Sequence, residues 1–97
     1  PYIETIAIHN EEKEELVIFA VNRSEDTSIA FTFEEDGFEM ESISEATELA
    51  GYDKKDTNES NHELVTLSIK TDVVLENDII STIMKPLSWN VIRIKTK

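Results

Sequence analysis

Apolar residues in this 97-residue chain recur mostly at every second position, in short runs that are separated by polar turns. A period of two places successive side chains on opposite faces of a strand, whereas a helical stripe repeats every 3.6 residues. No stretch of about ten residues has a convincing helical stripe. The turns recur at close to the spacing of about 8–12 residues that is typical of β-sandwiches. The sequence therefore predicts an all-β fold of two packed antiparallel sheets.

The clearest runs predict strands at 2–9, 16–21, 29–33, 64–69, 73–75, 79–84 and 89–94. The first two should pair as a hairpin across the polar residues 10–15. The run 16–21 is apolar on both alternating phases, which is typical of a central strand covered on both faces. The pattern weakens over 38–48, where Met40 and Ile43 are the expected inward residues, and 49–61 reads as a loop.

Length and residue usage limit the kind of protein further. A chain of 97 residues fits one domain, 1–97, and smaller pieces could not bury a core without disulfides or metals. There is no cysteine, which excludes disulfides and thiolate chemistry and fits a reducing compartment. The longest apolar run, 16–21, is far shorter than the roughly 20 residues that cross a bilayer. We expect a soluble, cytoplasmic domain.

The charge is strongly negative and unevenly distributed. The formal net charge is −12, and residues 1–50 hold 14 acids and 2 bases, whereas residues 51–97 hold 7 of each. Such a field repels phosphate backbones and anionic lipid surfaces, and there is no basic stripe to bind them. The composition therefore argues against nucleic-acid and membrane partners, and the acids are best explained as a solvated surface.

No catalytic, cofactor-binding or metal-binding residue can be assigned from the sequence. Glycoside hydrolysis needs two carboxyls about 5–5.5 or 6.5–9.5 Å apart, one of them desolvated. The acids here crowd predicted turns, where water would screen them. The two histidines lie beside turns, and no Gly-x-Ser-x-Gly motif accompanies them. The candidates set aside are Glu11, Glu12, Glu14, Glu15, Glu34, Glu35 and Asp36 as acids; Asn10-Glu11 and Asn58-Glu59 as acid/base dipeptides; Asp53, Asp56 and Glu59 as a calcium loop; and His9 and His62.

Aromatic residues can serve as sugar-stacking platforms only where their rings are exposed. Three phenylalanines, Phe19, Phe31 and Phe33, fall on apolar phases and are expected in the core. Trp89, in the last strand, is also expected to be buried. Tyr2 and Tyr52 remain as possible platforms, and two scattered rings predict a weak site.

Several segments resemble the closing part of glycoside hydrolase family 51 α-L-arabinofuranosidases. The last strand reads Pro86-Leu87-Ser88-Trp89-Asn90-Val91-Ile92-Arg93-Ile94, which is similar to the Pro-x-Ser-Trp-Asn-Val-Ile-Arg string of that family. Val21-Asn22-Arg23-Ser24, Ala7-Ile8-His9-Asn10-Glu11-Glu12 and Glu48-Leu49-Ala50-Gly51, with Asp53 and Thr57-Asn58, also match in the same order. A histidine common before the Glu-Leu pair is replaced here, at Ala46 or Thr47.

The resemblance implies a C-terminal accessory domain of a larger enzyme. In that enzyme a (β/α)8 barrel would hold two catalytic glutamates and release terminal L-arabinofuranose by a retaining mechanism, as part of L-arabinose metabolism. The barrel of the parent chain would be this domain's partner, residues from the beginning of that chain would complete the sandwich, and the whole would form a homo-oligomer. None of the catalytic residues would lie on this chain.

Three functions therefore remain open for the chain itself. It could be a structural domain that supports a glycosidase barrel and its oligomer, a carbohydrate-binding module for arabinan or arabinoxylan, or a free-standing interaction domain. The first is favoured. Trp89 discriminates against the second, because a binding module would expose this ring.

Overall fold

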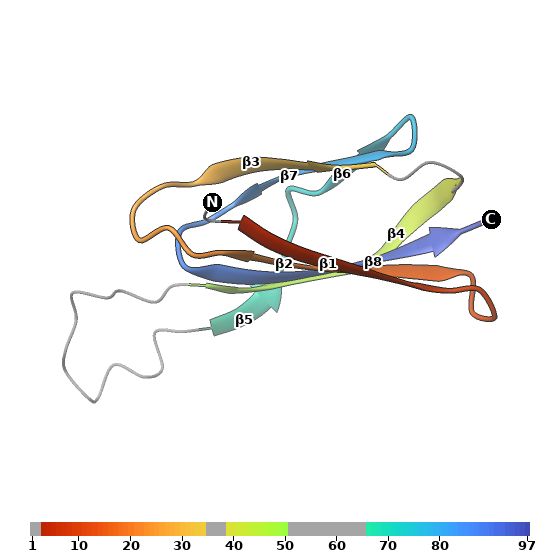
Figure 1. Ribbon diagram of the computed structural model, residues 1–97, viewed down its shortest axis with the longest axis horizontal. Coiled ribbons are helices and arrows are strands. Elements are labelled where there is room, and N and C mark those ends of the chain that lie inside the picture. The colour runs from red at the N-terminus through yellow and green to blue at the C-terminus, as the bar shows by residue number, and fades with distance from the viewer. Residues whose placement is uncertain (1–2, 35–38, 51–65) are drawn as a thin grey trace.

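The computed structural model describes residues 3–34, 39–50 and 66–97. These residues form antiparallel strands in two stacked layers, with no helix among them, as Figure 1 shows. Consequently, no helix in the described part of the chain could cross a membrane. The predicted all-β, antiparallel sandwich is confirmed.

The larger layer is a five-stranded sheet whose strand order does not follow the sequence. The order across the sheet is β1 (Ile3–Asn10), β2 (Glu15–Asn22), β8 (Ser88–Thr96), β4 (Met40–Ala50) and β5 (Thr66–Ile69). Strands β1 and β2 form the predicted hairpin. The last strand in sequence, β8, is inserted between β2 and β4, so the centre of the sheet depends on pairing between distant segments.

The smaller layer has three strands, in the order β3 (Ile29–Phe33), β7 (Ile79–Met84) and β6 (Val74–Glu76). The β6–β7 turn has two central residues, Asn77 and Asp78, with φ of 52° and 62°. Two positive φ angles match the twist of a two-residue hairpin, and Asn and Asp tolerate this conformation better than most residues.

The core lies between the two layers. The buried cluster draws on both sheets and consists of Leu16, Ile18, Met40, Ala46, Ile80, Ile92 and Ile94. Two aromatic residues of β3, Phe31 and Phe33, pack against it while remaining partly exposed. Their predicted core position is therefore confirmed.

Strand β4 explains why the sequence pattern weakens over 38–48. The register with β8 shifts twice, between Met40 and Ser42 and between Ile43 and Glu45. Each shift adds a residue to one strand, so the spacing of inward side chains changes from two to three. The inward residues Met40 and Ile43 were predicted correctly. The predicted loop start at Leu49 was wrong, because β4 continues to Ala50; residues 51–65 lie outside the described residues.

Two aromatic residues face the opposite way from the prediction. Phe19 is 41% exposed and Trp89 is 63% exposed, on the side of the five-stranded sheet away from the smaller layer. A period of two shows that alternate residues lie on the same face of a strand, but it does not show which face is buried. The strands that hold Phe19 and Trp89 have apolar residues on both faces, so the pattern could not decide between them. The expected burial of Phe19 and Trp89 was therefore wrong. The two residues predicted as possible sugar-stacking platforms, Tyr2 and Tyr52, lie outside the described residues.

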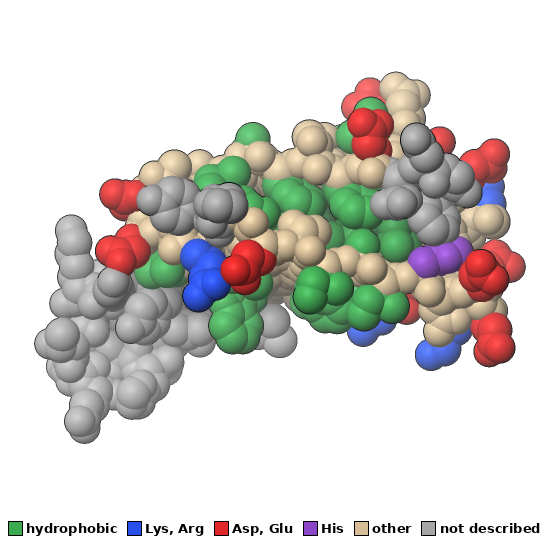
Figure 2. Space-filling model, in the orientation of Figure 1, with side chains coloured by type: hydrophobic (Ala, Val, Ile, Leu, Met, Phe, Trp, Pro, Cys, Tyr) green, Lys and Arg blue, Asp and Glu red, His purple; other side chains and the backbone are tan. Residues whose placement is uncertain are grey.

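The sandwich is open on the side where β1 and β3 form the edges of their sheets. On β1, Thr5 and Ala7 alternate with the outward residues, yet both are exposed because the smaller sheet does not extend over them. Figure 2 shows hydrophobic side chains between the two layers on this side. The described strands thus leave part of the core without cover.

Candidate functional site

The acids that the sequence placed in the first turn are exposed to solvent. Glu11, Glu12 and Glu14 are exposed in the β1–β2 turn, which Asn10 stabilises by accepting a 3.2 Å hydrogen bond from the Lys13 amide. His9 is partly buried in β1. Among the residues that are described, no three His, Asp or Glu side chains come close enough to hold a metal ion. The other candidates, Glu35, Asp36, Asp53, Asp56, Asn58, Glu59 and His62, lie outside the described residues.

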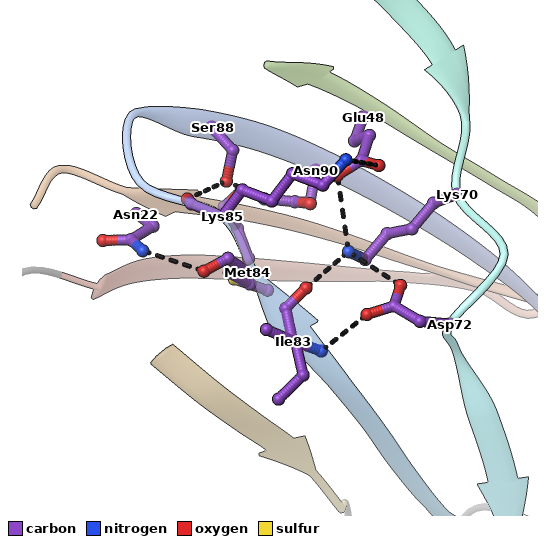
Figure 3. A network of polar contacts seen from close by, with 10 residues as sticks. Asn22, Glu48, Lys70, Asp72, Ile83, Met84, Lys85, Ser88 and Asn90 are labelled. Carbon is purple, nitrogen blue, oxygen red and sulfur yellow. Dashed lines mark hydrogen bonds and ion pairs between the residues drawn. The ribbon is translucent and has the colours of Figure 1, made fainter. Parts of the chain in front are cut away.

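A buried ion network is the most unusual polar feature of the described structure (Figure 3). The Lys70 side chain is only 1% exposed, and its ammonium lies 3.0 Å from Asp72 Oδ1 and 3.6 Å from Glu48 Oε2. The same ammonium donates a 2.6 Å hydrogen bond to the Ile83 carbonyl. The Glu48 side chain is 7% exposed, and its second carboxylate oxygen, Oε1, lies 3.2 Å from the exposed Lys85 ammonium. Two cations and two anions therefore balance.

This network connects the two layers of the sandwich. Glu48 is on β4 of the larger sheet, and the backbone of Lys70 bonds to the same strand through the Ala46 carbonyl at 2.9 Å. Asp72 accepts a 3.0 Å hydrogen bond from the Ile83 amide on β7 of the smaller sheet. Partial burial would raise the pKa of Asp72, but the bonds from Lys70 and Ile83 outweigh it and hold that pKa below its ordinary value.

Asn22, which opens the Asn-Arg-Ser motif, is a structural residue. Its side chain is fully buried, and its amide nitrogen donates 3.0 Å hydrogen bonds to the carbonyls of Thr27 and Met84. Its side-chain oxygen accepts a 2.9 Å bond from the Ser24 amide. The Ser24 carbonyl in turn accepts a 2.9 Å bond from Leu87, a residue in the left-handed region with φ of 49°. The motif thus fixes the β2–β3 connection onto the β7–β8 turn.

The Ser-Trp-Asn motif of β8 also holds structural residues, Ser88 and Asn90, whose side chains form hydrogen bonds within the fold. Ser88 donates a 2.7 Å hydrogen bond to the Lys85 carbonyl. Asn90 donates to the Ala20 carbonyl at 3.3 Å and to the Ser88 hydroxyl at 3.1 Å. Both side chains are at most 2% exposed, so neither can reach a ligand in solution. Sequence reasoning missed these buried polar roles because a polar residue in an alternating run is normally assigned to the solvent face.

The side of the five-stranded sheet away from the smaller layer carries several exposed apolar side chains. The pairing registers place side chains of all its strands in adjoining rows. We name this surface the apolar outer face; its exposed or partly exposed members are Ile6, Ile8, Phe19, Val21, Leu49, Ile69, Trp89 and Val91, and Val17 lies among them but is buried. Exposed fractions reach 64% for Ile6 and 78% for Ile69. A contiguous apolar patch of this kind marks a contact surface.

No family model matches the chain. The chain is 40% identical over 99 residues to the intracellular exo-α-(1→5)-L-arabinofuranosidase 1 of Bacillus subtilis, covering 98% of this chain and 19% of that protein. It is 37% identical over 92 residues to an intracellular exo-α-(1→5)-L-arabinofuranosidase of Acetivibrio thermocellus, covering 95% of this chain and 18% of the relative. The chain thus spans about a fifth of the length of the curated relatives it matches.

The same fold occurs in a solved structure of a family 51 α-L-arabinofuranosidase from Bifidobacterium longum. The TM-score is 0.78 at 20% identity, over 97% of this chain and 18% of that one. The chain is a small domain of glycoside hydrolase family 51. The resemblance seen in the sequence is confirmed, and in two of the motifs that carried it the side chains of Asn22, Ser88 and Asn90 are buried and hydrogen-bonded within the fold.

Proposed function

We propose that this family 51 domain is the C-terminal accessory domain of an α-L-arabinofuranosidase and has no catalytic residues of its own. In this proposal the intact enzyme removes terminal non-reducing α-L-arabinofuranose in the cytoplasm and forms a homo-oligomer, and the domain supports its catalytic barrel. The names of the relatives support the activity and the intracellular location. Their length supports the accessory role, since about four-fifths of each relative lies outside the matching region.

The open side of the sandwich carries this proposal. Strand β3 pairs with β7 on one side only, and its inward side chains Phe31 and Phe33 are still partly exposed. A strand edge beside uncovered apolar side chains favours pairing with a further segment. The remainder of the parent chain would supply that segment at a high effective concentration, because it is covalently attached.

The first test is an assay of the chain alone. We expect no hydrolysis of aryl α-L-arabinofuranosides by the purified 97-residue chain, because the acids described in it are exposed or in ion pairs. The full-length Bacillus subtilis relative, assayed in parallel, is the positive control. Turnover that stays with the chain through further purification steps would contradict the proposal.

A carbohydrate-binding role is the second candidate, and the exposure of Trp89 is the observation that favours it. The surroundings of this ring argue for a protein contact instead. In the pairing registers Trp89 lies between Val21 and Leu49, so its neighbours across the sheet are apolar. Sugar sites need polar groups that converge on the hydroxyls beside the stacked ring.

Calorimetry with arabinan and xylan fragments tests this second role. We expect binding no tighter than millimolar, which corresponds to about −4 kcal/mol, because a single ring supplies little affinity. Trp89→Ala should therefore leave the weak titration unchanged. Micromolar binding that disappears in Trp89→Ala would instead identify a carbohydrate-binding module.

A further inference from the structure

Lys70 is bonded to both layers of the sandwich. Its backbone amide donates a 2.9 Å hydrogen bond to the Ala46 carbonyl on β4 of the larger sheet. Its side-chain ammonium donates a 2.6 Å hydrogen bond to the Ile83 carbonyl on β7 of the smaller sheet. The chain passes from the larger sheet to the smaller one between Ile69, which ends β5, and Val74, which begins β6. Lys70 therefore lies where the chain changes sheets.

Ile83 lies on β7 at a position that β6 does not reach. The register pairs Val74 with Ser81, and extending it backwards would place Asp72 opposite Ile83, before β6 begins. The amide and the carbonyl of one residue in an antiparallel strand point to the same side. At Ile83 the amide donates a 3.0 Å hydrogen bond to Asp72 Oδ2, and the carbonyl accepts from Lys70. Two side chains thus take the place of the backbone partner that β6 does not provide.

The ion pair between Lys70 and Asp72 holds both side chains in the positions that Ile83 requires. The Lys70 ammonium lies 3.0 Å from Asp72 Oδ1, while Asp72 Oδ2 faces the Ile83 amide (Figure 3). A buried ion pair gains little net energy over well-packed apolar side chains, because removing the charges from water offsets their attraction. Its hydrogen bonds are directional, however, whereas burial of apolar surface is not. The pair therefore fixes positions that the apolar core leaves free.

We propose that Lys70 and Asp72 form a sheet-crossing clamp, which fixes where the chain leaves the larger sheet and thereby sets the alignment of the two layers. Through Lys70, Ala46 of the larger sheet is held at a defined position relative to Ile83 of the smaller one. Without the clamp, the amide and the carbonyl of Ile83 are unpaired at a strand edge, and the smaller sheet is free to shift over the apolar core. The clamp thus selects one arrangement of the layers, which is a different role from adding stability to that arrangement.

Amide hydrogen exchange of the 97-residue chain, followed by NMR at one fixed pH, tests the bond to Ile83. The reference is the amide of Ile80, in the same strand, which is paired with both β3 and β6. In Asp72→Ala the exchange rate of Ile83 relative to Ile80 should rise about tenfold, because the Ile83 amide loses its acceptor. Asp72→Asn should restore this ratio to within about threefold of the wild type, since the asparagine oxygen still accepts a hydrogen bond.

The matched control is Glu41→Ala. The Glu41 side chain is 44% exposed, against 45% for Asp72, and its carboxylate lies 3.6 Å from the Lys95 ammonium. This ion pair joins β4 to β8 within the larger sheet, so its removal should leave the ratio of the two rates unchanged. An unchanged ratio in Asp72→Ala would overturn the proposal.

NMR relaxation dispersion tests the alignment of the layers. In Lys70→Met the amides of β3 and β7 should show exchange broadening on the microsecond to millisecond timescale, whereas those of the β1–β2 hairpin should not. Lys85→Met, which removes the exposed cation of the network, should show no such broadening. If Lys70→Met does not fold, the same measurement on Asp72→Ala decides the outcome. Broadening that is equal in both sheets, or absent from β3 and β7, would show that the pair contributes to stability alone and would overturn the proposal.

Discussion

Replacing Lys70 with methionine is expected to lower the free energy of unfolding by about 3 kcal/mol, measured by urea denaturation at pH 7. The Lys70 ammonium is buried between Glu48 and Asp72, and it also satisfies the Ile83 carbonyl. Methionine fills a similar volume but leaves the 7%-exposed Glu48 carboxylate with Lys85 alone. A buried charge that loses its partner costs several times more than an exposed pair contributes.

Lys85→Met is the matched control for this prediction. It removes the other cation beside Glu48, but the Lys85 side chain is 61% exposed, so the loss should stay below about 1 kcal/mol. The double variant Lys70→Met/Glu48→Gln should lose less free energy of unfolding than the sum of the losses in the two single variants, because no buried charge remains in it. Equal losses for Lys70→Met and Lys85→Met would show that burial does not decide the energetics of the network.

The same variant has a defined pH dependence. Burial opposes ionisation of Asp72, but Lys70 and the Ile83 amide lower its pKa below 3.8 in the folded state. Because the folded pKa is lower than the ordinary value of 3.8, the Asp72 carboxylate stabilises the fold fully at pH values above 3.8. This contribution is lost as the pH falls through the lower pKa of the folded state. The stability difference between the wild type and Lys70→Met should therefore shrink as the pH falls below 3.8.

The alternation of apolar residues was sufficient to predict the strands and their antiparallel layers, because strand geometry requires only a period of two. It could not predict β4 in detail, since the two register shifts move Ile43 and Ala46 to a spacing of three. A repeat of three residues matches neither the period of two of a strand nor the alternation of three and four that a long helix shows. Local sequence carries no signal for a bulge that is fixed by the partner strand, here β8.

The inward or outward orientation of the central strands was also beyond sequence reasoning. Phe19 and Trp89 were expected in the core and are exposed, while Asn22, Glu48 and Asn90, for which the alternation predicts no position, are buried. A polar side chain can be buried only when the fold brings partners to it, and each of these three residues has at least one partner that is distant in sequence. Met84, for example, is 62 positions from Asn22. Only the family resemblance marked these positions in advance, without giving their role.

Asn22→Ala is expected to destabilise the domain by about 3 kcal/mol, at about 1 kcal/mol for each of three hydrogen bonds. The amide nitrogen of Asn22 satisfies the carbonyls of Thr27 and Met84, and its oxygen satisfies the Ser24 amide. Alanine would leave these backbone groups without a partner in a site from which water is excluded. Urea denaturation measures the loss, and Asn10→Ala, which removes one exposed 3.2 Å bond in a turn, is the control at below about 1 kcal/mol.

The position of Asn22 also predicts where the damage appears first. The residue fixes the β2–β3 connection, and the Ser24 carbonyl at its start holds the left-handed Leu87 in the β7–β8 turn. Without Asn22 this connection should open more often, so the amides of Ser24 and Leu87 should exchange with deuterium faster than those of the central strand β8. Uniformly faster exchange would instead indicate a general loss of stability, and unchanged exchange at both amides would show that the motif does not hold the two connections together.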